Sequence, residues 1–272
     1  MINYLVLPHL RVQGANIYNA AFLMGGPPVL PAWFLAHALG RDVDMADDVL
    51  SLAFVLHSLS PLGQYFYGNF NPQLRRGAAL TFGPSGTDYS SKNKHALALQ
   101  PVACAHLEAS LVVGVRDLAA TEGVSGMVRR RRLAGGIITG LRAPILTDDL
   151  EEALRRVGPG YVVRDRQDLL AGVAADQRAA TFVEVLGRKP SSAAKTGWLA
   201  AACLGYAAIT PFEQRAGARE GYDHAFAEPL VGLVQYVPLR RCLEEDAAAR
   251  TLWRPQWVAP DVFRIWQDPD HS

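Results

Sequence analysis

Four consecutive arginines, Arg129, Arg130, Arg131 and Arg132, are followed directly by Leu-Ala-Gly-Gly and the apolar run IITG. Arginines of this kind contact phosphates, and phosphate contacts supply most of the sequence-independent affinity for nucleic acids. Gly135 and Gly136 can form a tight turn that lets a ligand backbone approach this charge. We therefore predict phosphate contact by at least two of the arginines. Arginines near a helix end also stabilise the helix dipole, so a structural role stays open.

The opening of the chain offers neutral hydrogen-bonding groups. Residues 4–12 form an apolar run bounded by turn residues, as expected of a largely buried strand. The run holds Arg11 and is followed by Gln13 and Asn16, whose side chains both donate and accept hydrogen bonds. Such groups suit a polar backbone or the edge of a base.

A third candidate region combines aromatic rings with cations. Tyr65, Phe66, Tyr67 and Phe70 precede a polar, basic stretch, residues 73–95, that contains Lys92 and Lys94. Single-stranded RNA binds to such combinations, because bases stack on rings while phosphates take the positive charge. For the rings alone, the sequence favours the plainer interpretation of core packing. The lysines fit a solvated loop equally well.

Composition limits the classes of function. The chain has 272 residues, half of them apolar, enough for one large domain or a domain with an inserted subdomain. Its net charge is only +1, from 27 basic and 26 acidic residues, so any nucleic-acid site must be local. Cys104, Cys203 and Cys242 are widely spaced, as is typical of reduced, buried thiols. Without a leader-like segment or a bilayer-spanning apolar run, we expect a cytoplasmic protein without membrane contact.

Motifs for common enzyme chemistry are missing from the sequence. It contains no Walker-type GxxxxGK, no dinucleotide GxGxxG after a strand, no HExxH and no CxxC. No two histidines are spaced four residues apart, as a helical zinc site would need. We therefore expect no metal, no cofactor and no catalytic residue.

The periodicity of the chain predicts the elements that must position these residues. A Gly-Gly-Pro-Pro break precedes a helix from Pro31, and residues 49–59 form a second strand. Residues 105–115 alternate polar and apolar side chains, which predicts a strand with one polar face. The polar positions are His106, Glu108 and Ser110.

The rest of the chain mixes helices and strands. Residues 117–132, 148–157 and 167–186 are expected to be helical, with the strand-like segment GPGYVV between the last two. From residue 198 onward the pattern returns to short apolar strands. The tail contains Trp253, Trp257 and Trp266, which would either close the core or dock onto a neighbour.

Several segments, taken in order, resemble a known family. The opening LPHLRVQGAN, its GGPP turn and the helix FLAHALG resemble the start of the CRISPR-associated Csy-two or Cas-five family, the handle-capping subunit of type I-F surveillance complexes. The runs AHLEASLVVGV, RRLAGGIITG, GWLAAACLGYAAITP and FAEPLVGLVQY follow in the family's order. The resemblance touches most of the chain, but residues 158–197 are shorter than usual for the family, where a helical insertion is expected.

The resemblance implies an α+β fold, a modified ferredoxin-like (RRM-like) domain of the RAMP superfamily with a reduced helical insertion. Residues 1–147 would form the first part of the core. Residues 148–196 would form the helical insertion and a flexible loop, and residues 197–272 the C-terminal part of the core.

The resemblance also implies a function. Proteins of this family are non-catalytic Cascade subunits of antiviral defense. They cap the 5′ handle of CRISPR RNA (crRNA) and join the large subunit to the backbone subunits for DNA targeting. The expected partners are crRNA, these subunits and target DNA within the complex. In the family the glycine segment belongs to the RNA-facing architecture. The candidate RNA-binding residues are Arg11, Gln13, Asn16, Lys92, Lys94, Arg129, Arg130, Arg131, Arg132, Gly135 and Gly136.

Two alternatives remain from the sequence. Relatives with this fold process CRISPR RNA without a metal, and His37 is the candidate base for such an endoribonuclease. His37 lies among apolar residues, however, which favours a satisfied, partly buried histidine. The other alternative is an assembly or scaffold protein whose tryptophan-rich tail binds a partner and which does not contact nucleic acid.

Overall fold

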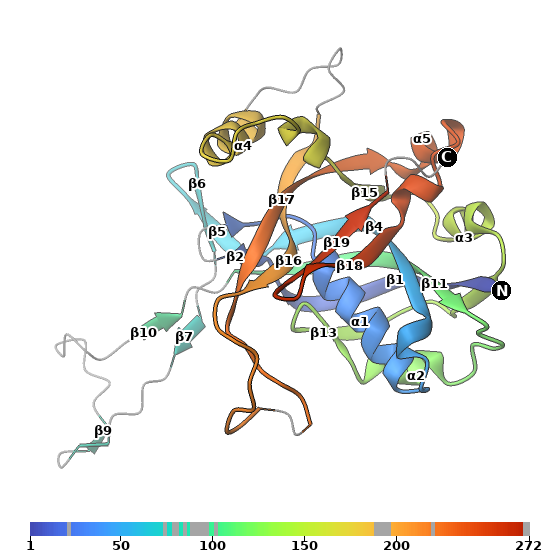
Figure 1. Ribbon diagram of the computed structural model, residues 1–272, viewed down its shortest axis with the longest axis horizontal. Coiled ribbons are helices and arrows are strands. Elements are labelled where there is room, and N and C mark those ends of the chain that lie inside the picture. Colours follow the sequence, from blue (N-terminus) through green and yellow to red (C-terminus); the bar gives the residue numbers. More distant parts are fainter. Residues whose placement is uncertain are drawn as a thin grey trace.

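The computed structural model describes residues 1–20, 23–72, 75–77, 82–83, 86–87, 98–100, 103–187, 197–218 and 221–268. Its main element is an eleven-stranded sheet in which the described strand pairs are antiparallel. A few short helices pack on this sheet (Figure 1). The expected α+β class is therefore confirmed as a large antiparallel sheet with few helices. Within the described ranges, no helix is long and apolar enough to cross a bilayer.

The first half of the chain provides four adjacent strands and two helices. Alternate strand residues such as Leu10, Phe54 and Leu111 form one core cluster with Leu30 and Val128, so both helices cover the same face of the sheet. In the sheet the strands are ordered β13-β1-β11-β4. Along the chain the elements are β1 (Ile2–Asn16), α1 (Val29–Arg41), β4 (Val49–Pro61), β11 (Cys104–Arg116), α2 (Val124–Arg129) and β13 (Gly136–Gly140).

Smaller elements complete this half, most of them in two-stranded pairs. They are the 3-10 helix η1 (Ala46–Asp48), the pairs β2 (Tyr18–Ala20) with β3 (Leu23–Met24), β5 (Gly63–Phe66) with β6 (Asn69–Pro72), β7 (Arg75–Gly77) with β10 (Ala98–Gln100) and β8 (Phe82–Gly83) with β9 (Gly86–Thr87), and the strands β12 (Arg132–Leu133) and β14 (Ile145–Thr147). Of the last two, β12 pairs with β13 and β14 pairs with β1.

The strand predicted over residues 105–115 lies within β11, where His106 is exposed and Glu108 is partly exposed, whereas Ser110 is fully buried. The helix predicted over residues 117–132 is too long, because α2 covers only Val124–Arg129. Asp117 and Gly123 adopt positive φ angles of 52° and 74°, which a right-handed helix does not contain. The chain therefore reaches α2 through an irregular loop.

The second half continues the sheet in the order β4-β15-β17-β16-β19-β18, and β18 pairs back onto β4 through Trp253 and Leu52. These six strands thus form a closed ring of pairings. Helices α3 and α5 cover the sheet face opposite α1, where Leu154 and Leu239 join a second core cluster. The elements are α3 (Leu150–Arg156), β15 (Tyr161–Asp165), η2 (Gln167–Leu170), α4 (Arg178–Gly187), β16 (Leu199–Ala208), β17 (Ala227–Pro238), α5 (Leu239–Glu244), η3 (Ala249–Thr251), β18 (Trp253–Ala259) and β19 (Val262–Gln267).

Residues 148–196 contribute more than helices. The helix predicted over residues 148–157 is α3, and the segment GPGYVV leads into β15, which lies between β4 and β17 in the sheet. The helix predicted over residues 167–186 is interrupted between η2 and α4, where Gly172 has a φ of 75°. The division of the chain at residues 147 and 196 stays a prediction.

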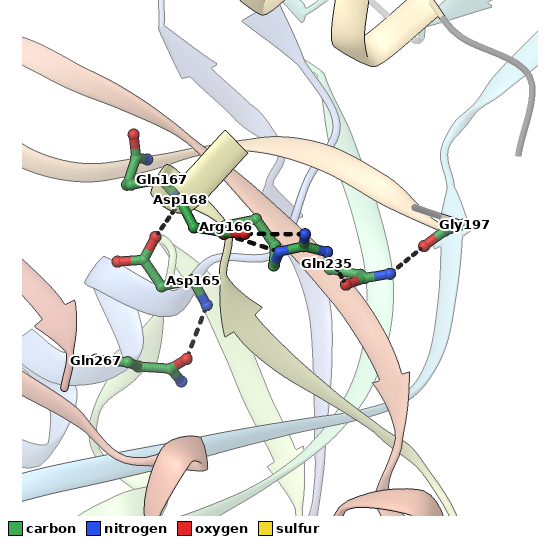
Figure 2. A network of polar contacts seen from close by, with 7 residues as sticks. All are labelled: Asp165, Arg166, Gln167, Asp168, Gly197, Gln235 and Gln267. Atoms are coloured by element: carbon green, nitrogen blue, oxygen red, sulfur yellow. Dashed lines mark hydrogen bonds and ion pairs between the residues drawn. The ribbon is translucent and has the colours of Figure 1, made fainter. Parts of the chain in front are cut away.

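The carbonyl oxygen of Val163 lies near the point at which the ring of strand pairings closes, and it accepts hydrogen bonds from two side chains. Only the first two residues of β15 pair with β4. Beyond them, side chains form the hydrogen bonds to the backbone of this edge. Gln267 accepts a hydrogen bond from Asp165 N–H through Oε1 at 2.7 Å (Figure 2). Its Nε2 donates to the Val163 oxygen at 3.0 Å, so the carboxamide replaces a neighbouring strand. The buried Trp253 donates from Nε1 to the same oxygen at 3.0 Å.

Replacing Gln267 by Met tests this closure. Methionine is similarly long but leaves the Asp165 N–H without its acceptor, so we expect the free energy of unfolding to fall by about 1–3 kcal/mol. Urea unfolding measures the change. Gln214→Met, which removes an exposed carboxamide bonded to Asp223, is the control and should stay within about 0.5 kcal/mol. Equal effects of the two substitutions would contradict a special role for Gln267.

Candidate nucleic-acid interface

The polar end of β1 lies on the sheet face opposite α1 and α2. Arg11 and Gln13 are exposed there, while Leu10 and Val12 point into the core. Two bulges, around His9 and Gly14, each insert one extra residue into β1 relative to β11. Each extra residue shifts the alternation of side chains along β1 by one position. As a result, apolar side chains on both sides of each bulge point into the core. Arg11 and Gln13 therefore face outward together.

Neighbouring strands extend this polar surface. Arg11 lies opposite Glu108 of β11, and Glu108 lies opposite Ser58 of β4. His106 and Ser60 form the next pair along these strands. We call this surface the open sheet face. Its polar residues are Arg11, Gln13, Ser58, Ser60, His106 and Glu108.

The strands β12 and β13 form a hairpin that lies against the polar end of β1. Its turn residues, Ala134 and Gly135, have φ angles of 48° and 76°, as in a type I′ turn. Asn16 donates its backbone N–H to the Ala134 oxygen at 2.8 Å, and Gln13 pairs with Ile137. The structure thus brings the glycine segment and the opening strand together, although more than a hundred residues separate them in the chain.

The two glycines of this hairpin differ in their surroundings. A Cβ on Gly136 would lie 2.7 Å from Ala15 N, so Gly136 is needed for the close approach of the hairpin to β1. Gly136 is buried, whereas Gly135 is exposed and a Cβ there would meet nothing within 4 Å. Of the two, only Gly135 is open to a ligand.

The four predicted arginines divide into two groups. Arg131 forms an ion pair with Asp42 at the end of α1, with Nε 3.2 Å from Oδ2. Arg132 donates to the Gly135 oxygen at 3.1 Å and so supports the turn. Arg129 and Arg130 are exposed, and neither has an ion-pair partner among the residues that the structure places. These last two are therefore the better candidates for phosphate contact.

The aromatic side chains after β4 are not core residues. Tyr65, Phe66 and Tyr67 are 78%, 66% and 91% exposed, because the hairpin of β5 and β6 projects away from the main sheet (Figure 1). The interpretation of these rings as core packing is therefore wrong. Lys92 and Lys94 lie outside the described residues, and their RNA contact stays a prediction.

A pair of stacked histidines, not predicted from the sequence, lies beside the open sheet face. The rings of His9 and His57 are 4.3 Å apart between centroids and inclined by 15°. His9 Nδ1 lies 2.5 Å from Glu108 Oε1, and His57 Nε2 lies 2.7 Å from Ser110 Oγ. The polar alternation of β11 was visible in the sequence, but nothing there indicated that β1 and β4 would place histidines next to it.

Burial lowers the pKa of His57, and the adjacent His9 adds to this effect, although a hydrogen bond to the Pro159 carbonyl oxygen opposes it. Because the oxygen of Pro159 can only accept, His57 Nδ1 carries the proton in this bond. His57 Nε2 then accepts from the hydroxyl of Ser110. The neutral imidazole therefore satisfies both partners.

His37, the alternative catalytic base, lies on α1 at a separate hollow of about 620 Å³. Burial lowers its pKa, with a further contribution from the charge of Arg41. Aromatic rings surround the hollow, and Trp257 there is 60% exposed, whereas Trp253 is fully buried. Among the described residues that line the hollow, none is a lysine or arginine that could hold a phosphate.

Substituting the two hairpin glycines tests their separate roles. Gly136→Ala forces the hairpin away from β1, and we expect a loss of about 1–3 kcal/mol in the free energy of unfolding. Gly135→Ala meets open space and costs only the strain of a positive φ, about 1 kcal/mol. Thermal or urea unfolding of both variants checks this order. A greater loss for Gly135→Ala would contradict the packing role of Gly136.

Replacing His57 by Gln tests whether the lowered pKa of this partly buried histidine makes the stability of the protein depend on pH. A pKa lower in the folded than in the unfolded protein means that the unfolded state binds more protons below the usual histidine pKa. The stability contribution of His57 is thus present above that pKa and is lost as the pH falls. We expect urea midpoints to decrease more for the wild type than for His57→Gln between about pH 7 and pH 5. Parallel pH profiles would contradict this.

Comparison with known proteins shows the family to which the chain belongs. A scan against family models matches residues 5–187 to the family described as CRISPR-associated protein (Cas_Csy2). The matched segment includes the open sheet face, the arginines and the glycine hairpin. A search of curated proteins gives no match. Because the family match covers more than half of the chain, the protein belongs to the CRISPR-associated Csy2 family and is a Cascade-type subunit, a component of a CRISPR surveillance complex.

Proposed function

We propose that this subunit binds crRNA without cutting it, caps the 5′ handle of the guide and bridges the large subunit and the backbone subunits of a type I-F complex or a variant of it. One observation carries the proposal: exposed cations and carboxamides gather around a single hairpin. Arg11 and Gln13 face outward beside it, Asn16 bonds to its turn, and Arg129 and Arg130 end the helix that leads into it.

The order of elements supports an RNA-binding core. The sequence β1-α1-β4-β11-α2-β13, with the sheet order β13-β1-β11-β4 and both helices on one face, matches the ferredoxin-like arrangement of RNA-recognition motifs. In such motifs single-stranded RNA lies on the sheet. We therefore assign a modified ferredoxin-like core of the RAMP superfamily to this half and assign the RNA to the open sheet face.

The side chains of this face, and those at the end of α2, suit different parts of an RNA strand. Arg11, Arg129 and Arg130 would neutralise phosphates, which fixes the strand without reading its sequence. Gln13 can donate to and accept from a base edge. Asn16 Oδ1 accepts from Tyr18 N–H at 2.9 Å, which leaves its Nδ2 as a donor for the RNA.

The exposed hairpin of β5 and β6 supports a second kind of contact. Tyr65 lies edge-on to Phe70, with ring centroids 5.4 Å apart, and Phe66 lies edge-on to Tyr67 at 4.5 Å. Rings exposed to this extent can stack on unpaired bases. We assign the hairpin to the guide strand, close in sequence to Lys92 and Lys94.

Reversing the charge of Arg129 and Arg130 together tests the proposal. The double Glu variant should retain less RNA on purification from a host that expresses the neighbouring subunits. Each lost phosphate contact should reduce the slope of log affinity against log salt by about 0.7–0.9. Competition binding at several salt concentrations measures both effects.

The matched control is Arg240→Glu with Arg241→Glu, which changes the net charge equally on α5, a helix that contacts β17. The control should retain RNA with the wild-type salt slope. If both double variants behave like the wild type while protein partners still co-purify, the chain is an assembly protein and the proposal fails.

A further inference from the structure

The backbone and ring of His9 are fixed on every side except one. Its φ is 53°, which histidine tolerates better than most residues, and its N–H donates to Ser110 Oγ at 2.9 Å. The ring stacks on His57, and Nδ1 bonds to Glu108 at 2.5 Å. His57 is itself held by Ser110 and by the Pro159 oxygen. A residue constrained in this way indicates a requirement for one defined orientation.

The arrangement leaves two polar atoms available. Within the part of the chain that the structure describes, His9 Nε2 and Glu108 Oε2 have no hydrogen-bond partner. The side chains of His9 and Glu108 are 14% and 33% exposed. The neighbouring Gly158 has no side chain, and a Cβ there would lie 3.9 Å from His9 Nε2. His9 Nε2 is therefore the ring atom left for a small ligand, while Glu108 orients the ring through Nδ1.

The chemistry of the pair favours a hydroxyl over a phosphate. The carboxylate of Glu108 repels a phosphate but not a neutral hydroxyl. Because a hydroxyl has one hydrogen, it donates that hydrogen to His9 Nε2 while Glu108 holds Nδ1 on the other side of the ring. Arg11 lies directly opposite Glu108, and a phosphate bound to Arg11 would place the adjoining ribose above the pair.

We propose that His9 and Glu108 form a ribose-reading site, which hydrogen-bonds the 2′-hydroxyl of one guide nucleotide and so distinguishes RNA from DNA. The inference rests on the proposed function, since it requires a guide strand on the open sheet face. The 2′-hydroxyl is the group by which proteins tell RNA from DNA at a given position. In a complex that holds crRNA and target DNA together, such a site would keep the DNA strand off this face.

The test measures binding of the full chain to short single-stranded oligonucleotides of mixed sequence and identical length. The set contains the all-RNA strand, the all-DNA strand, and RNA strands with one 2′-deoxy position each. We expect about a three- to tenfold loss of affinity at one or two deoxy positions, as for one or two hydrogen bonds. Equal binding of all singly substituted strands overturns the inference while leaving RNA binding, and hence the proposed function, intact. A chain that binds no RNA strand overturns both.

Variants identify the residues responsible. His9→Asn keeps a residue that tolerates positive φ and a donor near Glu108, but it lacks an atom at the position of Nε2. It should lose the positional deoxy effect, as should Glu108→Gln in part, while DNA affinity stays unchanged. His9→Gln places an amide near the Nε2 position and should keep part of the effect. Glu228→Gln on β17 is the control for the lost charge. A wild-type deoxy effect in His9→Asn would overturn the assignment.

Discussion

The register of β1, a strand paired on both edges, determines which of its side chains face outward in the candidate interface. The strand is hydrogen-bonded on both edges, to β11 on one side and to β13 and β14 on the other. A shift of one residue would move Leu10 and Val12 out of the core, so the register is fixed by burial. The same register turns Arg11 and Gln13 outward. The polar surface of the subunit is therefore set by its apolar core.

The four arginines divide between contacts within the fold and the phosphate contact that we propose. Arg131, between α2 and β12, forms an ion pair with Asp42 at the end of α1, and Arg132 supports the turn at Gly135. An exposed ion pair such as Arg131–Asp42 contributes little to stability, whereas the hydrogen bond from Arg132 to Gly135 helps to orient the hairpin. Arg129 and Arg130 remain for phosphates. The RNA contact that we propose needs such a local cluster, because the net charge of the chain is only +1.

Much of the fold could be predicted from local pattern. The alternation in residues 105–115 and the apolar run at residues 4–12 correspond to β11 and β1, and the charged amphipathic pattern at residues 148–157 corresponds to α3. Patterns of this sort report which face of one element is buried. The exposure of the aromatic residues after β4 could not be predicted, because whether a hairpin leaves the sheet depends on tertiary contacts and not on its composition. The stacking of His9 on His57 could not be predicted, since it depends on the register of three strands and on a bulge.

The most direct test of the account is to purify the tagged protein from a host with the neighbouring genes intact, then sequence the bound RNA and identify the bound proteins by mass. Handle capping predicts one class of guide RNA with a constant 5′ end, several protein partners and retention that weakens as salt rises. Protein partners without RNA would contradict RNA binding as the role of the open sheet face. RNA with heterogeneous 5′ ends would contradict capping of the handle.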